Sequence, residues 1–245
     1  MLKIDDPNTW PENIIKQLNA QPVLSLLKSN NFIEHIDDEL DIQDILADVD
    51  DYAESEGIVV YHCTKQLPEK LFKDTGLRLL DLETHHREFL ELIRNRPSVS
   101  KELFNRIEKA LSDWRVGEES RERKLWFCLR RNVILYDFDS GSEYLLKCYG
   151  GEAIYMPFIY KPEMKDVTNL LEELGEPVVV EARLSVSSLR RYKIYSLGRT
   201  LVGCFANSIN PDFHINDYNE CGLTEILPCD IIAVHPHKQF IQSTE

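Results

Sequence analysis

A histidine and a threonine close an apolar stretch of the chain, in the pattern of ligand-binding residues at the end of a β-strand. The stretch is Ile58–Thr64, with the sequence IVVYHCT. Alternate side chains of a strand point to opposite faces, so His62 and Thr64 are expected on the same face as Val60. An imidazole and a hydroxyl on one face can both hydrogen-bond a ligand. The alternative is a core histidine whose ring bonds to a backbone carbonyl.

The segment Tyr61–Thr64 (YHCT) resembles the YHGT motif that opens the NAD site of the diphtheria-toxin-like and poly(ADP-ribose)-polymerase-like ADP-ribosyltransferases. Cys63 stands where that family has a small glycine. In the family, a strand-end histidine holds the ribose of NAD, an aromatic ring stacks on the nicotinamide, and a glutamate near the start of a later strand activates the ribose. The resemblance spans about residues 58–235, and the histidine motif is its most specific part.

The resemblance implies a set of residues that bind NAD, which would be a substrate. His62 matches the family histidine and Thr64 the hydroxyl beside it, while Tyr144 or Tyr149 would supply the stacking ring. Cleavage of the bond between ribose and nicotinamide develops positive charge on the sugar, as in glycoside hydrolysis. Such a site therefore requires a carboxylate that faces the ribose.

Two glutamates are candidates for that carboxylate. Glu152 follows Gly150 and Gly151, which are expected to stop a helix, and it is predicted to open a strand. Glu225, in LTEILPCDIIAV, is predicted to enter the first of two short strands split by Pro228, and it resembles the late glutamate of many of these enzymes. Chain order favours Glu225 and the neighbouring glycines favour Glu152, so both remain candidates.

The resemblance implies an NAD-dependent ADP-ribosyltransferase that modifies an intracellular macromolecule, either a protein or a nucleic acid. By analogy, a chain of this kind is similar to the intracellular toxins and phage-defence enzymes of that superfamily. The alternative is a protein without enzymatic activity that binds a nucleotide or a partner through the same groove.

The six cysteines are scattered through apolar segments, which is typical of reduced thiols in a cytoplasmic protein. A cysteine hydrolase built on Cys63 would need His214, His235 or His237 as its base. Zinc binding would use Cys204, His214, Cys221 and Cys229, but no CxxC pair is present, so no metal site is predicted. His85 and His86 are adjacent on a predicted helix, about 100° apart, and are expected on the surface.

The elements around these residues predict an α+β fold, with a mixed, mainly antiparallel sheet and inserted helices. Residues 1–56 are expected to form an acidic helical extension, and residues 57–245 the ADP-ribosyltransferase-like domain. The net charge is −14, and residues 34–56 hold eleven acidic residues with no lysine or arginine. The last helix of the extension would bind a basic partner or pack beside the basic segments 121–131 and 190–199. No stretch is long and apolar enough to span a membrane.

Overall fold

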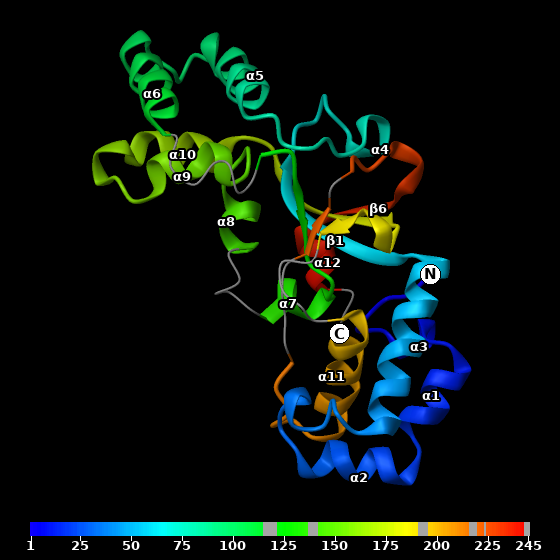
Figure 1. The fold of residues 1–245 in the computed structure, drawn as a ribbon. Helices are drawn as coiled ribbons and strands as arrows, with labels where there is room; N and C mark the ends of the chain where they lie inside the picture. The colour runs from blue at the N-terminus through cyan, green and yellow to red at the C-terminus, as the bar shows by residue number, and fades with distance from the viewer. Residues whose placement is uncertain (115–121, 137–141, 191–195, 216–219, 223, 243–245) are drawn as a thin grey trace. The chain divides into compact units, whose positions relative to one another are not determined.

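A computed structural model describes residues 1–245 except 115–121, 137–141, 191–195, 216–219, 223 and 243–245. The fold is α+β, as predicted, with helices inserted between strands that form two three-stranded sheets (Figure 1). The chain divides into two compact units, and strands β1 and β3 each pass from one unit into the other. Residues 191–195 of the basic segment 190–199 lie outside the described residues.

The first unit contains residues 1–61, 126–136 and 182–222. Its helices and strands are α1 (Glu12–Leu18), α2 (Gln21–Ser29), α3 (Leu40–Glu56), the first part of β1 (Ile58–Gln66), β2 (Leu125–Phe127), α7 (Arg131–Tyr136), β4 (Leu189–Arg190), α11 (Leu197–Ile209) and β5 (Glu220–Gly222). The N-terminal segment is therefore helical, as predicted, and it packs within this unit (Figure 1).

Helix α3 is amphipathic and packs against α11. Its buried residues recur at helical spacing and are Ile42, Ile45, Val49 and Ala53. The two backbones approach so closely at Gly198 that a Cβ there would lie 2.6 Å from the carbonyl oxygen of Leu46. Arg199 of α11 forms an ion pair with Asp37, just before α3, and the Gly198 N–H donates to Asp50 at 3.1 Å. The acidic segment thus meets one end of the predicted basic segment.

The strands of the first unit form a small sheet in the order β2-β5-β4. β4 and β5 are antiparallel, with Leu189 opposite Gly222. Cys128, directly after β2, forms an antiparallel bridge with Tyr61 of β1, and two backbone hydrogen bonds of 2.8 and 2.9 Å hold it. This bridge therefore lies one residue before His62.

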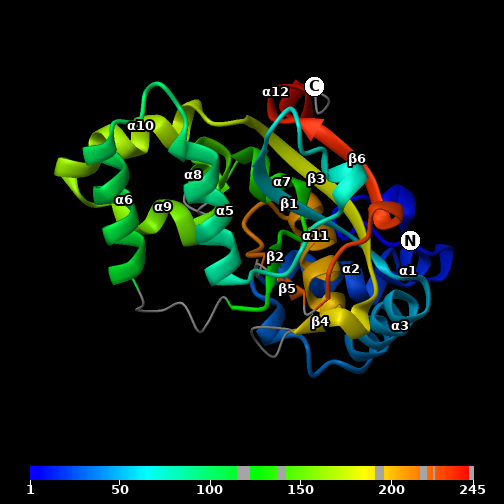
Figure 2. The same ribbon diagram turned by 90° about the horizontal axis from the view of Figure 1, so that it is seen from above.

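The second unit contains residues 62–125, 137–181 and 223–245. Its sheet has the order β1-β3-β6, and Figure 2 shows β3 between its two neighbours. The elements are α4 (Phe72–Thr75), α5 (Leu82–Arg94), α6 (Lys101–Asp113), α8 (Ser142–Lys147), α9 (Glu152–Ile159), α10 (Lys165–Glu173), β3 (Glu176–Leu184), β6 (Ile231–Pro236) and α12 (His237–Gln242).

Four helices of the second unit, α5, α6, α9 and α10, enclose a continuous apolar core. Phe89, Ile107, Phe158 and Leu171 contribute one buried side chain from each of them. Ser100 caps α6 and accepts from the Leu103 N–H at 3.1 Å. Across the described residues, no helix is both long and apolar enough to cross a membrane.

Candidate functional site

The predicted strand that carries His62 is present as β1. Along its second half, burial alternates: His62, Thr64 and Gln66 are half-buried, whereas Cys63 and Lys65 are buried. This period of two confirms that the imidazole and the Thr64 hydroxyl share one face of the strand. Cys63 lies on the other face, so its thiol is not presented beside them.

Lys65 is a buried cation on β1 that the sequence analysis missed, and its side chain is only 5% exposed. Its ammonium donates to the carbonyl oxygens of Lys147 and Glu172 at 3.2 and 2.5 Å, and that of Leu171 lies 3.4 Å away. These carbonyls belong to the C-terminal ends of α8 and α10, where an unpaired carbonyl and the helix dipole both favour a cation. Burial lowers the pKa of Lys65, so the surrounding oxygens stabilise a charge that is costly to bury. Lys65 thereby anchors β1 to two helices.

The Gly150-Gly151 turn lies directly before Glu152, but Glu152 does not open a strand. The two glycines have φ angles of 89° and 66°, in the left-handed region, and Glu152 is the first residue of helix α9. A carboxylate in the first helical turn is favoured by the helix dipole. The predicted strand was wrong because the following residues are apolar without a period, and such a run does not distinguish a buried helix from a strand.

Two adjacent histidines of α5 hold this turn. Nε2 of His85 donates to the carbonyl oxygen of Gly150 at 2.7 Å, and Nε2 of His86 to that of Ala153 at 3.0 Å. Both side chains are half-buried and not the surface residues that the sequence predicted. Burial lowers the pKa of His85, which keeps this imidazole neutral at physiological pH. Spacing of about 100° excludes a shared metal ion, but it allows one hydrogen bond to the Gly150 carbonyl and another to the Ala153 carbonyl, three residues further on.

The two candidate stacking tyrosines have different environments. Tyr149 is packed at 28° to the ring of Phe89, with centroids 6.4 Å apart, and burial raises the pKa of its phenol. Tyr144 is 37% exposed and stacks on Tyr155, with centroids 5.8 Å apart. Tyr144 is therefore the more accessible ring for a ligand.

Glu225 is exposed, and it lies one residue before a single antiparallel bridge between Leu77 and Ile226. A 3₁₀ turn at Pro228–Asp230 follows, and only then does β6 begin, so the first of the two predicted short strands is reduced to one bridge. The bridge brings Glu225 near Arg78, whose pKa is raised mainly by its hydrogen bond to Glu88 and further by the charge of Glu225. The Arg78 guanidinium lies 2.8 Å from a Glu88 oxygen.

A carboxylate and a histidine pair with each other across neighbouring strands of the second unit. Glu181 of β3 is 7% exposed, and its Oε2 lies 2.8 Å from Nε2 of His235 on β6. Since a carboxylate only accepts, Nε2 carries the proton that is shared. From the sequence, His235 was expected only as a possible base for a Cys63 hydrolase. The strand pairing that brings it to Glu181 has no local signal in the sequence.

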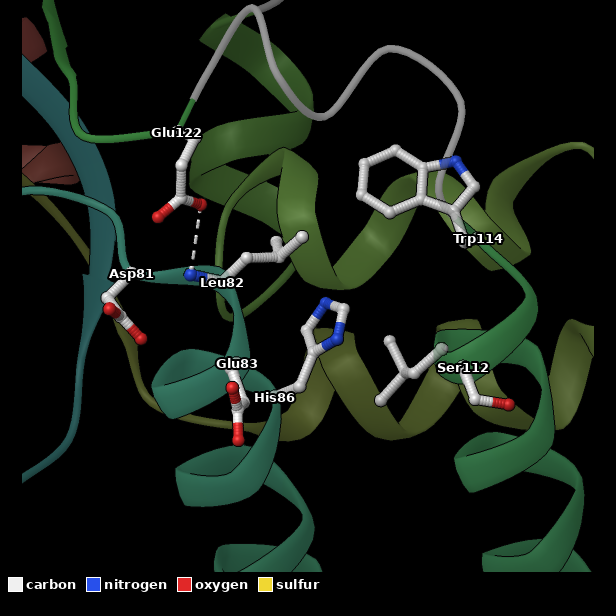
Figure 3. Close-up of a pocket in the computed structure, with 8 residues that line it drawn as sticks. Asp81, Leu82, Glu83, His86, Ser112, Trp114 and Glu122 are labelled. Atoms are coloured by element: carbon white, nitrogen blue, oxygen red, sulfur yellow. Dashed lines mark hydrogen bonds between the residues drawn. The ribbon is translucent and has the colours of Figure 1, made fainter.

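A pocket of about 480 Å³ opens between the start of α5 and the end of α6 (Figure 3). Its lining residues are Asp81, Leu82, Glu83, His86, Leu111, Ser112, Trp114 and Glu122. None of the six residues predicted from the sequence lines it. His86 connects it with the Gly150-Gly151 turn, because the same ring lines the pocket and bonds to Ala153.

Within the described residues, no group of three or more histidine, cysteine or acidic side chains could hold a metal ion. Cys63 and Cys148 are buried cysteines outside any disulfide, and burial raises the pKa of Cys204 to about 12. A thiol with that pKa is a poor metal ligand and a poor nucleophile at neutral pH. The side chain of Cys221 lies outside the described residues.

Comparisons with protein-family models, with curated proteins and with solved structures found no match to this chain.

Proposed function

We propose that this chain is an NAD-dependent ADP-ribosyltransferase that acts on an intracellular protein or nucleic acid. The observation that supports the proposal best is the placement of His62 and Thr64. Both are half-buried on one face of β1, a strand that is otherwise mostly buried. In the family that the YHCT motif resembles, this arrangement holds the ribose of NAD. Lys65 strengthens the argument, because it fixes the same strand to the ends of two helices.

Glu152 and Glu225 are the two candidates for the catalytic carboxylate. Glu152 begins helix α9, whereas Glu225 precedes a single bridge and comes before strand β6. The family position is a glutamate near the start of a later strand. We therefore propose to test Glu225 first, with Glu152 beside it.

In the proposed reaction, the bond between the ribose C1′ and the nicotinamide nitrogen breaks, and its electron pair leaves with nicotinamide. A nucleophile of the acceptor forms the new bond to C1′ and releases a proton. His62 and Thr64 would orient the ribose by hydrogen bonds, and the exposed ring of Tyr144 would stack on nicotinamide. The carboxylate would stabilise the positive charge that develops on the sugar.

The test is incubation of the purified chain with isotope-labelled NAD and a cell extract. Mass spectrometry would measure free nicotinamide and labelled macromolecules. We expect His62→Ala and one of the variants Glu225→Gln and Glu152→Gln to abolish release of nicotinamide, and His35→Ala to leave it unchanged. Calorimetry with NAD would show that the inactive glutamine variant retains binding, since the loss of charge at constant shape affects the developing cation most.

Other results would change the assignment. Full activity of both Glu152→Gln and Glu225→Gln would show that neither carboxylate faces the ribose. Binding of NAD without release of nicotinamide would support the alternative, a nucleotide-binding protein without enzymatic activity. The absence of any NAD binding would overturn the proposal. The identity of the labelled acceptor would also show whether it is a basic protein, which is the kind of partner that the acidic segment 34–56 would bind.

A further inference from the structure

The pocket at the start of α5 has an asymmetric lining. In Figure 3, the carboxylates of Asp81, Glu83 and Glu122 lie to one side and the Trp114 ring to the other, with His86 and Leu82 between them. Leu82 and the buried Leu111 add apolar surface to the lining. The volume, about 480 Å³, is within the range of sites for small ligands, roughly 300–1,000 Å³.

The carboxylates of the pocket have few partners among the described residues. Asp81 accepts from the Thr84 N–H through Oδ1, and Glu122 accepts from the Leu82 N–H through Oε2. The Thr84 N–H is the main cause that lowers the pKa of Asp81, a hydrogen bond to the Thr84 side chain is the next, and the charges of Arg123 and Arg87 add to them. In the part of the chain that the structure describes, Asp81, Glu83 and Glu122 form no ion pair.

The polar side chains of His86 and Ser112 differ in what they offer a ligand. Nε2 of His86 donates to the Ala153 carbonyl, so only Nδ1 of this ring is left for a ligand. The Ser112 hydroxyl donates to the carbonyl of Lys109 at 2.9 Å and points away from His86 in Figure 3. The face of the Trp114 indole attracts cations. The pocket therefore suits a ligand that is cationic, rich in N–H donors and partly apolar.

We infer that this pocket binds an alkylguanidinium group, either as a free small molecule or as an arginine side chain. A guanidinium is planar, so it can stack on the Trp114 ring while its edge donates to the carboxylates. An ammonium group is compact and strongly hydrated, and it has no flat face for an indole. The inference does not rest on the proposed transferase activity, because it concerns none of the residues assigned to NAD.

Calorimetry with butylguanidinium tests the inference on the full chain. We expect saturable binding, weaker binding of butylammonium, and no binding of butylurea, which has a similar planar shape without the charge. Glu122→Gln should weaken the affinity about tenfold, since it removes a charge-assisted hydrogen bond while its amide oxygen can still accept from Leu82. Glu91→Gln is the matched control. Glu91 is exposed on α5, the helix whose first turn lines the pocket, and it is not a lining residue. The variant removes the same charge and should bind butylguanidinium like the unchanged protein.

If Glu122→Gln does not fold, Glu83→Gln replaces it, because the exposed side chain of Glu83 forms no hydrogen bond with the residues that the structure describes. An acetylated arginine tripeptide, compared with its citrulline counterpart, distinguishes the two sources: tighter binding than butylguanidinium identifies a polypeptide side chain, and equal binding identifies the free group as sufficient. The inference is overturned if butylguanidinium does not bind at millimolar concentration. It is equally overturned if butylurea binds as well, or if the pocket variants and Glu91→Gln bind alike.

Discussion

Nε2 of His235 lies 2.8 Å from Oε2 of Glu181, and the two residues stand on adjacent strands of one sheet. Glu181 is buried in the central strand, whereas the His235 side chain is 35% exposed. The histidine therefore supplies a hydrogen bond to a carboxylate that water reaches poorly, and it does so from the edge strand β6.

His235→Ala is expected to destabilise the protein by about 1–3 kcal/mol, because it removes a hydrogen-bond partner of a buried carboxylate. The double variant with Glu181→Gln should lose less than the sum of the two single variants, since it also removes the buried charge. Urea unfolding measures both effects. His214→Ala, at an exposed position, serves as the control, and an equal loss in this control would contradict the role assigned to the pair.

The stability contributed by His85 should depend on pH. Burial lowers the pKa of this residue in the folded protein below its ordinary value of 6.5, so the unfolded chain binds the proton more readily. The contribution is therefore complete above about pH 6.5 and is lost as the pH falls toward the folded pKa. Unfolding of the protein and of His85→Gln, measured from pH 7.5 to 5, should show the smaller pH dependence in the variant. Parallel pH profiles would exclude this coupling.

Lys65→Met should lower stability by about 1.5–3 kcal/mol even though it removes a buried charge, because carbonyl oxygens of two helix ends lose a charged donor. The exposed Lys73 offers a matched control, and Lys73→Met should change stability by less than about 0.5 kcal/mol. Thermal unfolding checks both variants. A Lys65→Met protein that is as stable as the original would show that its methylene chain, and not the ammonium, supports β1.

Two glycines of α11 should respond in opposite ways to alanine. Alanine is the better helix former by about 1 kcal/mol. At Gly198, however, the new Cβ would lie 2.6 Å from the Leu46 carbonyl oxygen, so α3 and α11 would have to separate, at a cost of about 1–3 kcal/mol. At Gly203 the nearest atom is 3.5 Å away, and the substitution should be neutral or stabilising. Urea midpoints of the two variants check this, and similar midpoints would contradict the close approach.

For the candidate site, the sequence predicted the element but only part of its surroundings. The alternating strand of His62 and Thr64 was predictable, because strand geometry fixes which side chains share a face. The element that Glu152 begins was not predictable, because a run of apolar residues after two glycines is compatible with either a buried helix or a strand.

The sequence by itself determined the α+β class, the helical N-terminal segment and the amphipathic face of α3, because each follows from the local period of apolar residues. Tertiary structure alone decided that His85 and His86 bond to the Gly150 and Ala153 carbonyls, more than sixty residues away. It also decided that Lys65 caps two helices and that Glu181 pairs with His235. A hydrogen bond between distant residues depends on where the chain returns in space, and burial then determines the protonation of its partners, so neither leaves a local signal in the sequence.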